Sequence, residues 1–160
     1  MWSLKSKARN FLIYSVYPIA TFVFREKPYA RVISLHDIPE KSQEKFLEKI
    51  QWLKSNCNIV SLDDIYNKVR LKPDSLNVAL TFDDGFKEHA TFVASALRRF
   101  SIPATFFIPS GVCDAGENFG KENLRRNGSF KFMSKQEVSL LARDPLFKIG
   151  GHTVHHINLG

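Results

Sequence analysis

Two groups of residues in this chain have side-chain types and spacings that could carry chemistry. The first is the pair Asp83-Asp84, which follows an apolar run from Val78 to Phe82 and precedes Gly85. A continuous apolar run is typical of a strand buried on both faces in a parallel sheet. Such sheets place their chemistry at the carboxyl ends of the strands, so these carboxylates are candidate site residues. The alternative is an ordinary turn, because Asp-Gly is common in turns.

The second group is the stretch His152-Thr153-Val154-His155-His156. Histidines at positions i and i+4 can lie on one side of a helical turn and bind one metal ion, whereas the alternative is a polar loop with solvated histidines. Two histidines and one carboxylate of the aspartate pair make a His-His-Asp set, which suits a catalytic divalent metal. Zinc is the first expectation, and cobalt, manganese, nickel or iron also fit. The other carboxylate would lie beside the metal, placed to accept a proton from water.

The elements that must position these groups follow from the hydrophobic pattern. The chain has 160 residues and 44% hydrophobic content, which suits one globular domain with a core. Strands are expected at residues 31–36, 58–62, 78–82, 104–108 and 147–149, with helical segments between them. This alternation predicts an α/β fold with parallel strands. Four polar residues lie at or just after the end of a predicted strand, so we expect them to gather on one rim: His36, Asp83, Asp84 and His152.

Three finer expectations concern the segments around these strands. Residues 112–132 are polar and without a clear period, which predicts a long loop. Ser134 and Glu137 match the capping box that begins a helix. His89 follows Gly85 on a predicted helix, and we expect it at the protein surface.

Both chemical motifs resemble those of a known enzyme family. Thr81-Phe82-Asp83-Asp84-Gly85 resembles the TFDDG motif of the polysaccharide deacetylases, carbohydrate esterase family 4. The histidine stretch matches their second motif, H-[ST]-x-x-H. The apolar ATFF strand, the M-S-x-x-E-V sequence and the strand VISLHDI, which carries His36, are also similar to this family. The resemblance covers about residues 30–160.

The resemblance implies a distorted (β/α) barrel, incomplete in this chain, and metal-dependent removal of acetyl groups from an N-acetylated glycan. Carried over by position, Asp83 is the general base, while Asp84, His152 and His156 hold the metal. His155 occupies a free position of the motif and is not expected to be a ligand. Thr153 would support the histidine loop by a hydrogen bond. His36 either borders the substrate groove or is simply a polar strand end.

The sequence also departs from the family. The later motifs normally supply an arginine that orients the base, an Asp/Trp groove wall and a histidine that protonates the leaving amine, and none is found in these 160 residues. We therefore expect the N-terminal portion of a deacetylase, with an unpaired apolar sheet edge, or a short relative completed by a partner. A catalytically incomplete metal- or glycan-binding module is the alternative function.

The first 29 residues differ from the rest. Lys5, Lys7 and Arg9 precede the apolar stretch 11–24, which is too short to span a membrane as a helix. This order favours an interfacial segment at a membrane surface, and a hydrophobic helix packed on the domain is the alternative. The expected organisation is thus a segment at 1–29 and a deacetylase domain at 30–160. The net charge of +7 suits anionic surfaces, and no nucleic-acid-binding motif accompanies it, so nucleic acid is the weaker expectation.

Overall fold

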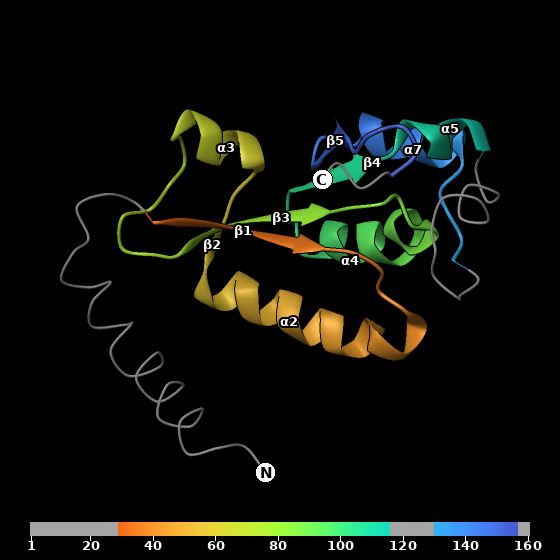
Figure 1. Ribbon diagram of the computed structural model, residues 1–160. Helices are drawn as coiled ribbons and strands as arrows, with labels where there is room; N and C mark the ends of the chain where they lie inside the picture. The colour runs from red at the N-terminus through yellow and green to blue at the C-terminus, as the bar shows by residue number, and fades with distance from the viewer. Residues whose placement is uncertain (1–28, 116–129, 157–160) are drawn as a thin grey trace, which may run out of the picture.

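The computed structural model describes residues 29–115 and 130–156 of the chain (Figure 1). Strands and helices alternate along these residues. Their bounds are β1 (Ala30–Leu35), η1 (Glu40–Ser42), α2 (Gln43–Asn56), β2 (Asn58–Ile59), α3 (Leu62–Asn67), β3 (Asn77–Phe82), η2 (His89–Val93), α4 (Ala94–Arg99), β4 (Ala104–Ile108), α5 (Ser110–Ala115), α7 (Lys135–Arg143) and β5 (Phe147–Gly151). The segment at 1–28, with its predicted interfacial stretch, lies outside the described residues. Within the described residues, no helix is both long and apolar enough to cross a membrane.

The strands form one sheet of five strands in which every pairing is parallel. The order is β1-β3-β4-β5, and the short β2 pairs with the beginning of β3. β1 pairs with β3 along its whole length, from Ala30 opposite Asn77 to Leu35 opposite Phe82. All carboxyl ends therefore point the same way, and the predicted parallel α/β fold is confirmed.

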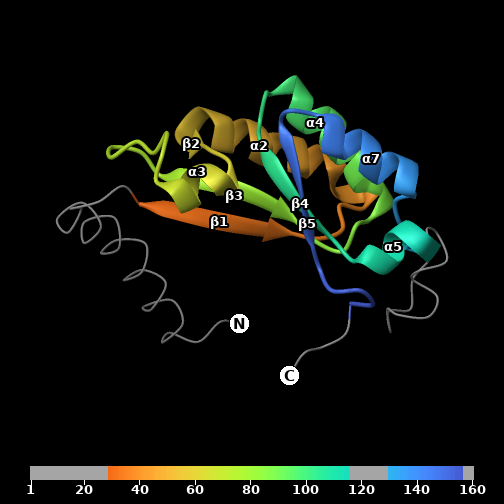
Figure 2. The ribbon, with the colours of Figure 1, turned by 90° about the horizontal axis from the view of Figure 1, so that it is seen from above.

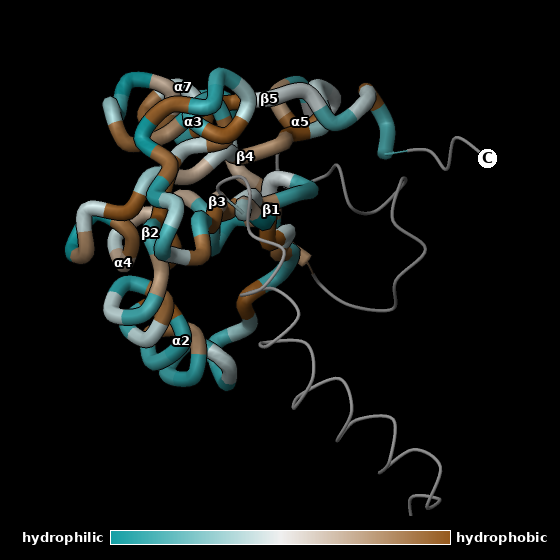
Figure 3. The backbone as a smooth tube through the Cα atoms, turned by 90° about the vertical axis from the view of Figure 1, so that its left-hand side faces the viewer, coloured by the Kyte–Doolittle hydropathy of each residue, from teal (hydrophilic) through white to brown (hydrophobic). Residues whose placement is uncertain are grey.

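The helices α2, α4 and α7 lie along one side of the sheet (Figure 2). Apolar and polar residues alternate around α2, as the tube in Figure 3 shows, because a surface helix turns one apolar stripe towards the core. Phe46 and Ile50 of that stripe are buried and belong to the same cluster as Phe82 of β3. All six residues of β3 are buried, as its continuous apolar run predicts.

Side-chain caps determine where two of the helices begin. Ser134 and Glu137 form a complete capping box at the start of α7, which confirms that prediction. Ser61 and Asp64 do the same for α3, and this early helix start limits β2 to two residues instead of the expected five. The backbone NH groups at a helix start need such acceptors because they have no partner within the helix.

The long loop expected at residues 112–132 is only partly present. Its first residues belong to α5, and Val112 there is fully buried. At its other end Phe132 is buried and stacks on Phe86, with ring centroids 5.4 Å apart. Residues 116–129 lie outside the described residues. The prediction was wrong at residues 112–115, which are helical, whereas residues 130–132 belong to no helix or strand although Phe132 is buried. Isolated apolar residues in a polar stretch carry no period but still pack when the fold brings them to the core.

Candidate functional site

The aspartate pair lies in a tight turn at the end of β3. The backbone NH of Asp83 donates to the Leu35 carbonyl at 2.9 Å, which extends the β1–β3 pairing by one residue. Asp84 and Gly85 then adopt left-handed backbone angles, with φ of 73° and 71°. A side chain at residue 85 would also be crowded, because a Cβ there would lie 3.0 Å from Cγ2 of Ile108. Glycine and, to a lesser extent, aspartate tolerate this region, so the local sequence suits the turn.

The histidine loop follows β5 and is anchored by its neighbours on β4 and α5. Four hydrogen bonds hold it: His152 N to Ile108 O at 3.1 Å, Ser110 N to Thr153 O at 3.0 Å, Gly111 N to Val154 O at 3.0 Å, and His156 N to Thr153 Oγ1 at 2.9 Å. The last bond confirms the supporting role predicted for Thr153. The helical turn considered for the two histidines is wrong, because Thr153 and His156 have φ of 62° and 54°. Three of the four hydrogen bonds join the loop to β4 and α5, and none of the four is the i to i+4 backbone bond of a helical turn.

Asp84, His152 and His156 converge on one point. Nε2 of His156 lies 2.8 Å and Nε2 of His152 lies 3.4 Å from the same oxygen, Asp84 Oδ1. That oxygen is buried and accepts no hydrogen bond, despite these short separations. A buried carboxylate oxygen without a partner is costly unless a cation compensates it. One carboxylate oxygen and two imidazole nitrogens within 4.8 Å of one another are a donor set that fits a divalent metal ion.

Asp83 has different surroundings from Asp84. Its Oδ2 accepts a 2.6 Å hydrogen bond from Ser34 Oγ and lies 4.0 Å from Nε2 of His36. The Asp83 side chain is 17% exposed, and that of His36 is 50% exposed. The expectation that acidic and imidazole groups gather on one rim is therefore confirmed, and they form two adjacent sets. His155 is exposed and stands apart from the metal-type cluster.

Sequence reasoning overlooked Ser34. It lies in β1, two residues before His36, which directly follows that strand. Side chains two residues apart on a strand share one face. The position of His36 at a strand end therefore held the signal that a polar side chain at residue 34 would point to the same rim.

The surface position expected for His89 is wrong, because this residue is fully buried. Its ring packs against those of Phe82, Phe86 and Phe106, with centroid distances of 5.4, 5.6 and 5.9 Å. The sequence held a signal, since residues 86, 89, 93 and 97 follow the i, i+3, i+7, i+11 spacing of one helix face. The turn containing His89 is π-helical.

His89 is held in a defined neutral form. Its Nε2 lies 2.9 Å from the backbone carbonyl oxygen of His36. A carbonyl can only accept, so Nε2 carries the proton, and the buried Nδ1 has no hydrogen-bond partner. Burial lowers the pKa of His89 to about 4. Through its hydrogen bond to the His36 carbonyl, His89 links the start of η2 to the segment that follows β1.

This low pKa predicts acid sensitivity of the fold. Between pH 6.5 and about 4 the unfolded chain binds a proton at residue 89 that the folded chain does not, so lowering the pH favours unfolding. The loss of unfolding free energy from this residue should approach about 3 kcal/mol at pH 4 and vanish above pH 7. Urea unfolding of the wild type and of His89→Asn at pH 7.5 and 4.5 measures it. The unfolding free energy of His89→Asn should change less between the two pH values than that of the wild type. The exposed control His155→Asn should show the same change as the wild type. An equal change in unfolding free energy for all three proteins would contradict the role assigned to His89.

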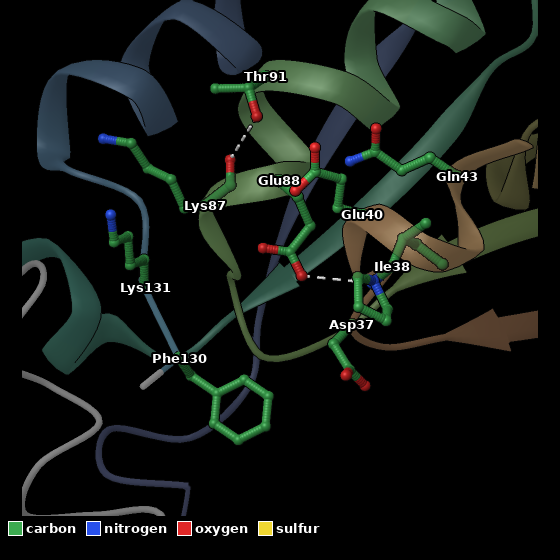
Figure 4. A pocket seen from close by; sticks show the side chains of 10 residues that line it. Asp37, Ile38, Glu40, Gln43, Lys87, Glu88, Thr91, Phe130 and Lys131 are labelled. Atoms are coloured by element: carbon green, nitrogen blue, oxygen red, sulfur yellow. Dashed lines mark hydrogen bonds between the residues drawn. The ribbon is translucent and has the colours of Figure 1, made fainter. Parts of the chain in front are cut away.

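A pocket of about 500 Å³ lies between the segments that directly follow His36 and Gly85 (Figure 4). Its lining residues are Asp37, Ile38, Pro39, Glu40, Gln43, Lys87, Glu88, Thr91, Phe130 and Lys131. Glu88 accepts a 3.2 Å hydrogen bond from the Ile38 backbone, and burial raises the pKa of its carboxyl. Carboxylates, ammonium groups and an aromatic ring in one pocket suit a hydroxyl-rich ligand. No sequence motif indicated this pocket.

Comparison with known proteins identifies similar chains. The sequence pattern of the family described as "Polysaccharide deacetylase" matches residues 70–160, which is more than half of the chain. The poly-beta-1,6-N-acetyl-D-glucosamine N-deacetylase of Staphylococcus aureus (strain MRSA252) is 29% identical over 120 residues, covering 74% of this chain and 38% of that enzyme.

Solved structures share the fold. A de-N-acetylase from Aggregatibacter actinomycetemcomitans superposes with a TM-score of 0.63 at 21% identity, over 78% of this chain and 55% of that one. IcaB from Ammonifex degensii superposes with a TM-score of 0.64 at 20% identity, over 80% of this chain and 54% of that one. This chain thus spans about half the length of these structures, and its parallel α/β fold matches part of theirs. With the family pattern found across both motifs, the chain belongs to the polysaccharide deacetylase family.

Proposed function

We propose that this chain carries the metal-binding and base residues of a hydrolase that removes N-acetyl groups from a carbohydrate polymer. The observation that carries the proposal is the convergence of His152 and His156 on the buried, unpartnered Oδ1 of Asp84, with Asp83 held separately next to it. Family membership supports the reaction class. The relative named for poly-beta-1,6-N-acetyl-D-glucosamine supports that polymer as the substrate to test first.

Each carboxylate has one role in this proposal. Asp84, with His152 and His156, would hold a divalent ion, and zinc is the ion to test first. Such an ion supplies Lewis-acid activation of water and of the acetamide carbonyl. Asp83 stays outside the ligand cluster, so its carboxylate remains available to take the proton of the attacking water.

His36 is the proposed source of the proton for the leaving amine. Its Nε2 lies 4.0 Å from Asp83 Oδ2, and half of its side chain is open to solvent and therefore to substrate. Cleavage of an amide needs such a donor, because an unprotonated amine is a poor leaving group. The sequence did not identify an acid, whereas the pairing of β1 with β3 brings this imidazole, which directly follows β1, close to the proposed base.

The pocket next to the site supports a polymeric substrate. It begins at Asp37, the residue after His36, and at Lys87, two residues after Gly85. Its carboxylates can accept hydrogen bonds from sugar hydroxyls, and Phe130 offers a ring on which a sugar can stack. In the proposal, this pocket takes a sugar unit near the one that is cleaved.

Acetate release tests the proposal directly. We expect the zinc-loaded protein to release acetate from β-1,6-linked N-acetylglucosamine oligomers, with a rate that saturates as oligomer concentration rises. The same oligomers without N-acetyl groups are the substrate control and should give no acetate. Saturable oligomer binding with no acetate released would overturn the enzymatic function and would favour a glycan-binding module.

A further inference from the structure

Ser34 lies on the same face of the sheet as Asp83. The parallel register places Ser34 opposite Thr81, and Asp83 is two residues further along that chain segment. Because successive strand residues alternate between the two faces of a sheet, Asp83 points to the same face as Thr81, and therefore to the same face as Ser34. Although they are 49 residues apart in the sequence, Ser34 Oγ donates to Asp83 Oδ2 at 2.6 Å.

We infer that Ser34 is a positioning residue for Asp83, and this inference rests on the proposed function in which Asp83 is the general base. An aspartate side chain has two rotatable bonds, so an exposed carboxylate samples several directions. A hydroxyl bond to one oxygen selects a single direction and leaves Oδ1 free to receive a proton. Bonds from a hydroxyl to a carboxylate are short and strong, as this one is.

Within residues 29–115 and 130–156, the Ser34 hydroxyl is the side-chain donor that holds this carboxylate. His36 faces the same oxygen but lies 4.0 Å away, beyond hydrogen-bond distance. A purely structural role does not account for Ser34, since it is exposed and outside the buried core. The pairing of β1 with β3 uses backbone groups, so this side chain is not needed for the sheet. What remains for the hydroxyl is its effect on Asp83.

Ser34→Thr and Ser34→Val form a matched pair for the test, because threonine and valine have similar shapes and only threonine carries a hydroxyl. Both suit a strand, and the exposed position has room for the added methyl group. We expect kcat for acetate release to fall about tenfold in Ser34→Val, with KM and zinc affinity unchanged. Ser34→Thr should keep the wild-type kcat. An equal kcat in wild type and Ser34→Val would overturn the inference.

A second measurement does not depend on activity. The Hα–Hβ scalar couplings of Asp83, measured by NMR, report whether its side chain occupies one rotamer or several. Wild type and Ser34→Thr should show one rotamer, and Ser34→Val should show averaging. A single unchanged rotamer in Ser34→Val would contradict the inference even if the wild type released no acetate. If the couplings behave as expected and the wild type is inactive, the proposed function fails and the positioning by Ser34 stands.

Discussion

Asp83→Asn is expected to lower kcat for acetate release by between about a hundredfold and about ten-thousandfold, the range that a general base contributes. Asparagine has nearly the same shape but cannot accept the proton of the attacking water. The oxygen bonded by Ser34 would remain an acceptor, so the local fold should persist. Asp83 is outside the ligand cluster, so zinc affinity should change little. Acetate release by stopped assay and zinc binding by calorimetry measure the two effects.

Two comparison variants sharpen this test. Asp74→Asn changes an exposed aspartate in a loop and should keep wild-type activity. His36→Gln should lose most activity on the N-acetyl substrate but little on 4-nitrophenyl acetate, because nitrophenolate leaves without protonation. Asp83→Asn should lose activity on both substrates. Activity of Asp83→Asn equal to wild type would rule out the assigned base.

His156→Ala is expected to weaken zinc binding by more than about a hundredfold and to remove acetate release. The reason is geometric, since Nε2 of His156 lies nearest to the buried Asp84 oxygen that needs a cation. Chelation of the wild type should likewise stop acetate release, and added zinc or cobalt should restore it. Competition with a zinc-sensitive dye measures the affinity.

The adjacent residue is the matched control. His155→Ala removes an imidazole of the same loop that is exposed and outside the cluster, so zinc affinity and activity should remain. Thermal unfolding offers a readout independent of catalysis. Zinc at about 100 times its Kd should stabilise the wild type by about 2.7 kcal/mol, and His156→Ala should lose this gain. Equal zinc affinity in the two variants would show that His156 is not a ligand.

Local sequence was sufficient for most of the secondary structure. The run Val78 to Phe82 indicated a strand buried on both faces, and all of β3 is buried. The Ser134 and Glu137 pair indicated the start of α7, where both hydrogen bonds of the capping box form. These features depend on neighbours within a few residues, so a pattern of residue types is enough to reveal them.

The loop conformation was not predictable in the same way. The spacing of His152 and His156 suited a helical turn, yet the chain there is left-handed at two residues. The spacing predicts which side chains can bind one metal ion, but more than one backbone conformation allows them to do so. Hydrogen bonds from Ser110 and Gly111, about forty residues away in the sequence, select the path that is used.

The sequence by itself determined the parallel α/β class, the strand ends at which Asp83, Asp84 and His152 lie, and the donor types of the candidate metal site, because these follow from local periodicity and side-chain chemistry. Only the tertiary structure decided that Ser34 and His36 lie beside Asp83. The physical reason is the register in which β1 pairs with β3. Pairing of β1 with β3 brings residues 34 and 83 together, and that pairing is chosen by the packing of the whole sheet on its helices.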